Sequence, residues 1–595
     1  MPLLRCAPVV RSLLLALIMF AVAVPPRLHA QTPPAGELQA LFAEAWAARL
    51  SEDPLFATSA GDHRYDDRLP SMTHADLERR AAYARSALTR LRAIDRSALS
   101  ASDRVNADMF ARELSDSVAD FEFGAYRIPI NADSGFHTDF ADLPDRMPFA
   151  TAKDYENYIA RLNAFPAYVA SEIALMREGI AARFTLPQVV LEGYDVTMAT
   201  HVVPAPEKSV FFAPFRRFPP GVPAGERARL TEAGRRAVMQ GTVAGYKALL
   251  EFMTTEYIPR ARTSIGASSL PRGREYYAHL VKSFTTLDLT ADQVHEIGRQ
   301  EVLRIRAEMD AVMAKTGFQG NFAAFLNFLR TDPRFYAKTP EELLKDAAYI
   351  AKQMDGELPS LFGHLPRLPY GIEPVPAHLA PKYTGGRYIE APVGSTRAGE
   401  YWVNTYALDK RPLYTLEALT LHEAVPGHHL QIALQQELTG LPEFRRFSGV
   451  GAFVEGWALY AERLGLEAGF YKDPYSDFGR LTYEMWRACR LVVDTGIHAK
   501  GWTRAEAMEY LESHTALSLH EVRTETDRYI SWPGQALCYK MGELKIRELR
   551  GQAEQALGQK FDVRSFHDVV LGSGAVPLTV LEEQVRAYIA EKGAP

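Results

Sequence analysis

The chain has 595 residues, of which 47% are hydrophobic, 24% charged and 11% aromatic. This is the composition of an ordinary globular protein, and it excludes a disordered, collagen-like or disulfide-rich chain. The 67 basic and 73 acidic side chains give a net charge of -6, which creates no cationic surface for nucleic acid. We therefore expect no nucleic-acid partner.

Residues 1–30 have the features of a secretory signal peptide. Arg5 and Arg11 precede an uncharged run over residues 13–24, and two prolines and the small Ala30 follow. The run is shorter than the roughly 20 apolar residues of a spanning helix, although an uncleaved N-terminal anchor is the alternative. We expect a periplasmic or secreted protein that has no membrane contact once the signal peptide is removed.

The three cysteines give little information about the fold. Cys6 would leave with the signal peptide, and no lipid-attachment pattern surrounds it. Cys489 and Cys538 remain, either as one disulfide, which an oxidising compartment allows, or as two buried thiols.

Helix-start signals recur along the rest of the chain. Thr290 with Gln293 and Thr503 with Glu506 form capping-box patterns, and Thr339 is followed by a proline at the first helical position. Few segments alternate in polarity as strands do, and no repeat marks a solenoid. The fold is predicted to be mostly α-helical, with a few short strands.

Residues 365–392 are dense in proline and contain a Gly-Gly pair, so they are predicted to form a long connection rather than a helix. This connection divides a helical N-terminal part, residues 31–364, from a C-terminal part, residues 393–595. A short strand is predicted at residues 401–404. Its edge could bind an extended substrate, which makes Asn404 a candidate substrate-binding residue.

The most informative segment begins at His422 and Glu423. In the common zinc-protease motif the second histidine stands four residues after the first, one helical turn away, but Pro426 occupies that position here. Because proline lacks an N–H and its ring collides with the preceding turn, we expect the helix to bulge or kink, with Gly427 supplying conformational freedom. Such a bulge would return His428 to the face of His422.

A catalytic zinc ion needs three protein ligands, so we expect one Zn²⁺ per chain held by His422, His428 and a third residue. Glu455, in an otherwise apolar helical stretch, is the candidate for that ligand. His429 is the alternative second ligand, or supports the site without binding the metal. Glu462 lies two turns after Glu455 and could hold a ligand histidine by its second ring nitrogen.

Glu423 is predicted to be the general base, which takes a proton from water and passes it to the leaving amine. A donor for the oxyanion is also needed, and the candidates are His498, Tyr529 and Tyr539. The remaining candidates are substrate-binding arginines. Either Arg490 or Arg523 could grip a C-terminal carboxylate bidentately, although structural ion pairing is the commoner role.

These segments resemble those of the domain of unknown function 885 family, whose members resemble gluzincin-type zinc peptidases. The matching segments are residues 154–162 (DYENYIARL), 284–298 (FTTLDLTADQVHEIG), 422–431 (HEAVPGHHLQ), 454–462 (VEGWALYAE), 490–498 (RLVVDTGIH) and 529–542 (YISWPGQALCYKMG). The resemblance implies a large helical metallopeptidase-like fold around a deep cleft, as in relatives of thimet oligopeptidase and carboxypeptidase Taq, with the N-terminal part walling the cleft. It also implies that His428 is the second ligand and that Tyr539 supports the transition state.

Three functional hypotheses follow. The leading one is a secreted zinc-dependent peptidase that cleaves short peptides as a carboxypeptidase or oligopeptidase. The second keeps the metal but hydrolyses a non-peptide amide or an ester. The third is a metal-containing binding protein without turnover, in which Pro426 has destroyed the catalytic geometry. The oligomeric state is open.

Overall fold

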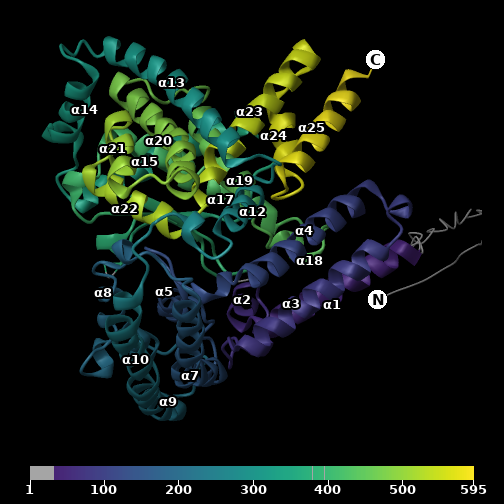
Figure 1. Ribbon diagram of the computed structural model, residues 1–595, viewed down its shortest axis with the longest axis vertical. Helices are drawn as coiled ribbons and strands as arrows, with labels where there is room; N and C mark the ends of the chain where they lie inside the picture. The colour runs from purple at the N-terminus through teal and green to yellow at the C-terminus, as the bar shows by residue number, and fades with distance from the viewer. Residues whose placement is uncertain (1–32, 378, 394–395, 595) are drawn as a thin grey trace, which may run out of the picture.

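The structure is a computed structural model that describes residues 33–377, 379–393 and 396–594. The expected signal peptide lies outside the described residues. Helices dominate, as predicted, and one small sheet accompanies them (Figure 1). Within the described part of the chain, no helix is both long and apolar enough to cross a membrane.

The first half of the chain forms two groups of helices (Figure 1). Those nearest the N-terminus are α1 (Pro33–Glu52), α2 (Pro54–Ser59), α3 (His74–Ala93) and α4 (Ala101–Phe123). The lower lobe of Figure 1 contains α5 (Phe136–Ala141), α6 (Leu143–Arg146), α7 (Ala152–Ala182), α8 (Val196–Ala199), α9 (Ala224–Ala237), α10 (Ala244–Phe252) and α11 (Ile258–Arg260).

The rest of the chain places the candidate site. The helices that lead to the sheet are α12 (Gly273–Thr285), α13 (Ala291–Lys315), α14 (Phe322–Thr331) and α15 (Pro340–Leu361). After the sheet come α16 (Leu416–Glu423), α17 (His428–Gln436), α18 (Glu443–Arg446), α19 (Gly451–Leu464), α20 (Pro474–Lys500), α21 (Arg504–His514), α22 (Leu519–Ser531), α23 (Cys538–Leu557), α24 (Val563–Leu571) and α25 (Leu578–Gly593).

The predicted helix starts are confirmed. Thr290 and Thr503 cap α13 and α21, each in a complete capping box. Thr339 caps α15 by accepting a hydrogen bond from the backbone N–H of Glu342. The Glu342 carboxylate accepts from the N–H of Lys338, one residue before the cap, so this box is not closed in the usual way.

The proline-rich segment is not a plain connection, because it contains two of the three strands. These are β1 (Tyr370–Pro374), β2 (Gly386–Ile389) and β3 (Gly399–Val403), in the order β1-β3-β2. Strand β3 pairs in parallel with β1 and antiparallel with β2. The strand predicted at residues 401–404 corresponds to β3, which begins at Gly399 and ends at Val403. It is the central strand and is paired on both sides, so the expected free edge for an extended substrate is not present.

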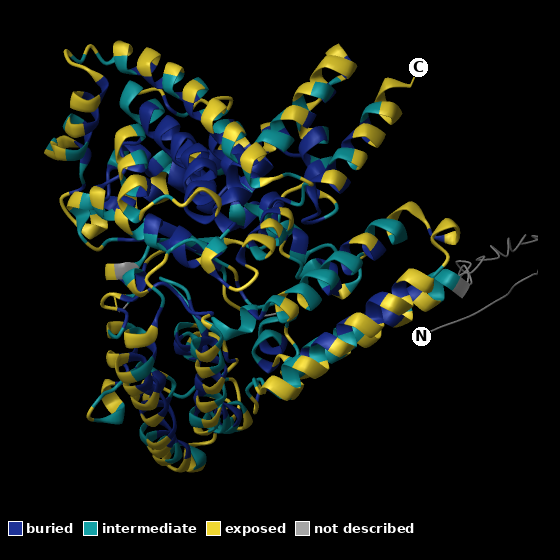
Figure 2. Cartoon of the chain, viewed as in Figure 1, coloured by how far each residue is buried: buried dark blue, intermediate teal, exposed yellow. Residues whose placement is uncertain are grey.

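The N-terminal and C-terminal parts share their hydrophobic cores. One core joins Tyr158 of α7 and Ile305 of α13 to Leu481 of α20, and another joins Leu38 of α1 to Phe453 of α19. Figure 2 shows the buried residues concentrated around α20, whose residues 478–498 are all buried. The two parts are thus built on common cores, not on separate ones.

Close approach of α19 and α23 determines where the third candidate ligand lies. A Cβ atom on Gly456 would lie 2.4 Å from the Cα of Gly542, and a Cβ on Gly542 would lie 1.8 Å from the carbonyl oxygen of Ala452. Only glycine fits both positions, so the two backbones touch. Glu455 precedes this crossing on α19, and Tyr539 lies on the facing helix.

Candidate metal centre

The helix that carries His422 is interrupted rather than kinked. Helix α16 ends at Glu423, the Val425–Pro426 peptide bond is cis, and α17 begins at His428. A Cβ on Gly427 would lie 1.9 Å from the carbonyl oxygen of His422, so the chain turns back against the end of α16 where only glycine fits. The expected distortion is present, but it is a complete break followed by a new helix.

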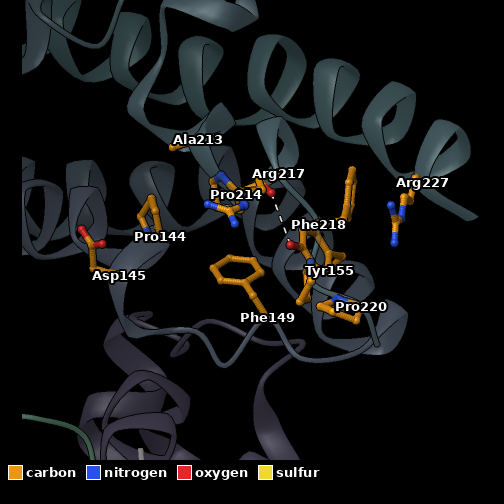
Figure 3. A pocket seen from close by; sticks show the side chains of 11 residues that line it. Pro144, Asp145, Phe149, Tyr155, Ala213, Pro214, Arg217, Phe218, Pro220 and Arg227 are labelled. Carbon is orange, nitrogen blue, oxygen red and sulfur yellow. Dashed lines mark hydrogen bonds between the residues drawn. The ribbon is translucent and has the colours of Figure 1, made fainter. Parts of the chain in front are cut away.

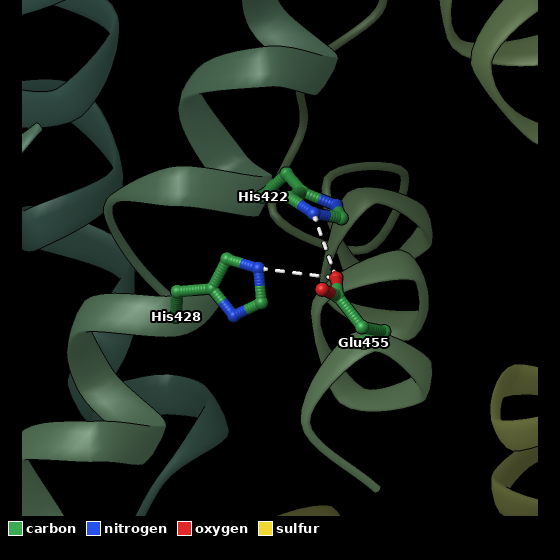
Figure 4. A group of neighbouring side chains, drawn as sticks. All are labelled: His422, His428 and Glu455. Atoms are coloured by element: carbon green, nitrogen blue, oxygen red, sulfur yellow. Dashed lines mark ion pairs between the residues drawn. The ribbon is translucent and has the colours of Figure 1, made fainter. Parts of the chain in front are cut away.

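This turn brings together the three residues predicted as metal ligands. One nitrogen or oxygen atom from each of His422, His428 and Glu455 lies within 4.8 Å of the others. Figure 4 shows both imidazoles directed at one oxygen of Glu455. The Glu455 Oε2 atom lies 3.4 Å from Nε2 of His428 and 3.7 Å from Nε2 of His422.

The group is largely buried but not sealed. The exposed fractions of the side chains are 3% for His422, 12% for His428 and 19% for Glu455. Burial alone would raise the pKa of Glu455, but the two imidazoles outweigh it and hold that pKa well below its usual range. Glu455 is therefore a carboxylate, as a metal ligand must be.

Glu462 lies at the second ring nitrogen of His422. Its Oε1 lies 2.8 Å from Nδ1 of His422, and Nη2 of Arg487 on α20 lies 3.2 Å from the same oxygen. Burial lowers the pKa of His422, yet Glu455 and Glu462 outweigh it and raise that pKa to about 9. With Nδ1 engaged by Glu462, the remaining nitrogen, Nε2, faces His428 and Glu455.

His429 points away from this group. Its Nδ1 lies 3.0 Å from the hydroxyl of Tyr388 on β2, and its ring lies 4.6 Å from the ring of Tyr370 on β1. Burial lowers the pKa of His429 to about 4, so the ring is neutral. His429 anchors α17 to the sheet, and His428 is the histidine that joins the group.

The general-base candidate Glu423 is held by the edge strand. The backbone N–H of Tyr388 donates to Oε2 of Glu423 over 2.8 Å, and the Glu423 side chain is buried. Strand β2 lies at the edge of the sheet, so its outward N–H groups are not used by the ladder. The sequence did not predict this contact, because Tyr388 and Glu423 lie in different segments and no sequence pattern links them.

Tyr539 lies beside the histidines. Its ring centre is 6.4 Å from that of His422, and the two rings are nearly parallel. The Tyr539 hydroxyl accepts hydrogen bonds from Nη2 of Arg528, at 3.1 Å, and Nε2 of Gln535, at 3.4 Å. Its own hydrogen is therefore available to another acceptor.

The other two oxyanion candidates have structural roles. His498 uses both ring nitrogens on the backbone: Nδ1 accepts from the N–H of Ala267, and Nε2 lies 2.9 Å from the carbonyl oxygen of Tyr529. The Tyr529 hydroxyl accepts from Trp486 and Arg490, at 2.7 and 2.9 Å. Both side chains are 0–1% exposed, so neither is free to meet a substrate.

The predicted substrate-binding residues are also placed elsewhere. Asn404 is fully buried, and its amide donates to the carbonyls of Ala380, Tyr383 and Thr384. It therefore closes the loop before β2 and has no donor left for a substrate.

Neither predicted arginine is free to bind a substrate carboxylate within the site. Arg490 is 1% exposed and pairs with Glu525 over 2.9 Å, and its guanidinium lies 4.0 Å from the ring centre of Tyr539. Arg523 is on the exposed side of α22. The short local patterns around these residues could not reveal which partners the folded chain supplies.

Sequence reasoning missed Arg487, which supports Glu462. One signal was available, because Arg487 stands one helical turn before Arg490, which the sequence did single out. The contact of the Arg487 guanidinium with the Trp486 ring, 4.2 Å from the ring centre, was not predicted either.

Two cavities of the described structure lie away from the metal group, because none of His422, His428 and Glu455 lines either of them. The larger, about 860 Å³, lies in the lower lobe between residues such as Phe149, Tyr155 and Phe218 (Figure 3). The smaller, about 470 Å³, is lined by residues of α4 and by Gly451 at the start of α19. The deep cleft implied by the resemblance to peptidases therefore stays a prediction.

Cys489 and Cys538 are both buried free thiols. The disulfide alternative is not realised, since Cys538 Sγ instead approaches the carbonyl oxygen of Phe284 at 3.3 Å.

Comparison with known proteins identifies the family. Residues 54–585 match "Bacterial protein of unknown function (DUF885)". The chain belongs to this family. A crystal structure described as that of a candidate lipoprotein from Colwellia psychrerythraea is 30% identical, covers 93% of this chain and 99% of its own, and superposes with a TM-score of 0.87.

A second solved structure shares the fold of this DUF885 member. It is described as a candidate lipoprotein of unknown function from Shewanella oneidensis, with 18% identity, coverage of 93% of this chain and 99% of that one, and a TM-score of 0.66. No curated protein matches the chain. The comparisons therefore establish family and fold, and the resemblance to gluzincin peptidases stays a proposal.

Proposed function

We propose that this DUF885 member is a zinc-dependent hydrolase that cleaves amide bonds in short peptides. The observation that carries the proposal is the convergence of His422, His428 and Glu455 within 4.8 Å, beside the carboxylate of Glu423. Two imidazoles and one carboxylate are a ligand set of catalytic zinc sites, which leave a further position open.

The residues present fit a zinc ion. Nε2 of His422 and Nε2 of His428 face the same oxygen of Glu455, and that buried oxygen has no hydrogen-bond partner in the described structure. A divalent ion would coordinate this oxygen. It would also replace the proton on Nε2 of His422, because a histidine that binds a metal is neutral. When bound, zinc supplies Lewis-acid polarisation of a carbonyl and lowers the pKa of water.

The remaining steps belong to the chain itself. Glu423, oriented by the Tyr388 N–H, accepts the proton of the attacking water and transfers it to the leaving nitrogen. Tyr539 donates its free hydroxyl hydrogen to the developing oxyanion, while Arg528 holds its oxygen. Glu462 and Arg487 keep the His422 ring in place.

We also propose that the chain is exported. The N-terminal pattern of residues 1–30 is that of a signal peptide. Both similar solved structures are described as candidate lipoproteins, which supports export. The cysteines of this chain are Cys6, Cys489 and Cys538, so none closely follows the apolar run to carry an acyl anchor. Release into the periplasm or the medium is the form of export that this sequence favours.

The test measures metal content and cleavage of a peptide library in parallel. We expect about one zinc per chain, and cleavage that falls about 10²- to 10⁴-fold in Glu423→Gln while zinc is retained. Glu443→Gln removes an exposed carboxylate on α18 and serves as the control. Equal cleavage by Glu423→Gln and the parent would show that Glu423 is not the general base.

Two other outcomes of this test favour the alternatives. Cleavage of amide or ester small molecules but of no peptide indicates a different substrate class. Bound zinc without turnover of any substrate indicates a binding protein.

A further inference from the structure

Arg387 lies next to the strand residue that binds the general base, and it has no carboxylate ion-pair partner among the described residues. It lies on β2, next to Tyr388, and is half-buried. Its guanidinium lies 5.1 Å from the ring centre of Tyr383 and forms no ion pair within the described residues. Side chains alternate across a strand, so Arg387 points to the face opposite Tyr388 and His429.

Arg528 approaches from the other side of the site, on α22. It is 8% exposed, and its Nε atom has no hydrogen-bond partner in the described structure. Its Nη2 donates to Tyr539, and its Nη1 lies 3.5 Å from Glu525. Glu525 is shared with Arg490, so one carboxylate serves two guanidinium groups. This part of the site therefore holds excess positive charge.

The two arginines lie within electrostatic reach of each other. Burial lowers the pKa of Arg387 and the Arg528 charge lowers it further, but Tyr383, Asp133 and Glu423 outweigh both. Asp133 also raises the pKa of Arg528. Of these two arginines, Glu525 pairs with Arg528 alone. Neither Asp133 nor Glu423 forms an ion pair with either arginine, so no carboxylate among the described residues bridges the two cations.

Two guanidinium groups that border the same site favour an anion between them. Carboxylates suit such a place, because each guanidinium offers paired N–H donors in a plane. The position is also suitable, since one arginine neighbours the residue that binds Glu423 and the other binds Tyr539.

We propose that Arg387 and Arg528 together bind a carboxylate of the substrate. The proposal rests on the proposed function, and it defines the substrate class as peptides with a carboxylate close to the scissile bond. A free C-terminus would make the enzyme a carboxypeptidase or dipeptidase, whereas an acidic side chain would make it selective for Asp or Glu. Carboxylate binding, which the sequence analysis expected of Arg490, is thus assigned to Arg387 and Arg528, because Arg490 is bound to Glu525 and Tyr529.

The test uses binding, so that it does not depend on turnover. The zinc-loaded Glu423→Gln chain is mixed with an equimolar tripeptide pool as free acids, or with the same pool as C-terminal amides, and retained peptides are measured by native mass spectrometry. A third pool of amides ending in Glu, compared with the same amides ending in Gln, separates a side-chain carboxylate from a free C-terminus.

We expect the carboxylate-bearing pool to be retained about 10- to 100-fold better than its neutral counterpart. Arg387→Met and Arg528→Met, each added to this background, should reduce that ratio to near 1. Arg523→Met removes a charge from the exposed side of α22 and should keep the ratio. Because Arg387 forms no ion pair in the described structure, its variant is expected to fold.

Equal retention of charged and neutral pools, a preference that survives Arg387→Met, or no retention of any pool would each overturn the carboxylate site. Failure of the proposed function has a different signature. In that case the charged pool is retained through Arg387, but the chain with Glu423 intact cleaves none of the retained peptides.

Discussion

Glu462 Oε1 lies 2.8 Å from His422 Nδ1, so a carboxylate on α19 sets the orientation of an imidazole on α16. The same oxygen is 3.2 Å from Arg487 on α20. Three helices are therefore tied together at one oxygen atom, and the free nitrogen of His422 is turned towards His428 and Glu455.

Replacing Glu462 by Gln should weaken zinc binding by about 10- to 100-fold, because the imidazole loses its oriented and charged partner. The dissociation constant can be measured by competition with a chromogenic chelator. Glu467→Gln, which loses only a surface pair with Arg550, is the matched control. An unchanged dissociation constant in Glu462→Gln would contradict the role assigned to it.

The two adjacent histidines should differ in their effect on metal content. His428→Ala removes a nitrogen that faces Glu455, so the purified protein should lose its zinc. His429→Ala removes a contact with Tyr388 and should keep the zinc. Elemental analysis of both variants decides between them, and the reverse pattern would show that His429 is the ligand.

Gly427→Ala should damage the turn between α16 and α17. Its Cβ would meet the carbonyl oxygen of His422 at 1.9 Å, so either the turn or the end of the helix must move. We expect a loss of about 1–3 kcal/mol in the free energy of unfolding, together with weaker zinc binding. Gly440→Ala is the control, since its Cβ meets no atom within 4 Å. Urea unfolding that gives equal losses for both variants would show that the turn tolerates a side chain.

We expect the stability of the fold to depend on pH through the buried side chain of Asp494. Burial raises its pKa to about 7, although hydrogen bonds from Tyr277 and Gly534 oppose this. An acid with a raised folded-state pKa stabilises the fold fully below its unfolded value of about 3.9, and this contribution is lost as the pH rises through 7.

Asp494→Asn keeps the shape of the side chain without the charge. Its free energy of unfolding should therefore fall less than that of the parent between pH 5 and pH 8, by about 3 kcal/mol. Urea unfolding at the two pH values measures the difference. Identical falls in the two proteins would mean that Asp494 does not titrate in this range.

The sequence alone determined the helical class, the starts of α13, α15 and α21, and the identity of the residues that meet at the candidate centre. These features are local, because a capping side chain or a proline acts within a few residues along the chain. The segment around Pro426 even indicated that the helix could not continue, although not that it would restart at His428.

Only the tertiary structure decided which polar side chains are free. His498 and Arg490 are of the residue types that the chemistry needs. However, His498 is hydrogen-bonded to backbone groups and Arg490 is paired with Glu525. Tyr388 and Arg487 reach Glu423 and Glu462 from segments far away in the chain. Buried polar groups must be paired, and the packing of distant helices chooses the partners, so no local pattern contains that information.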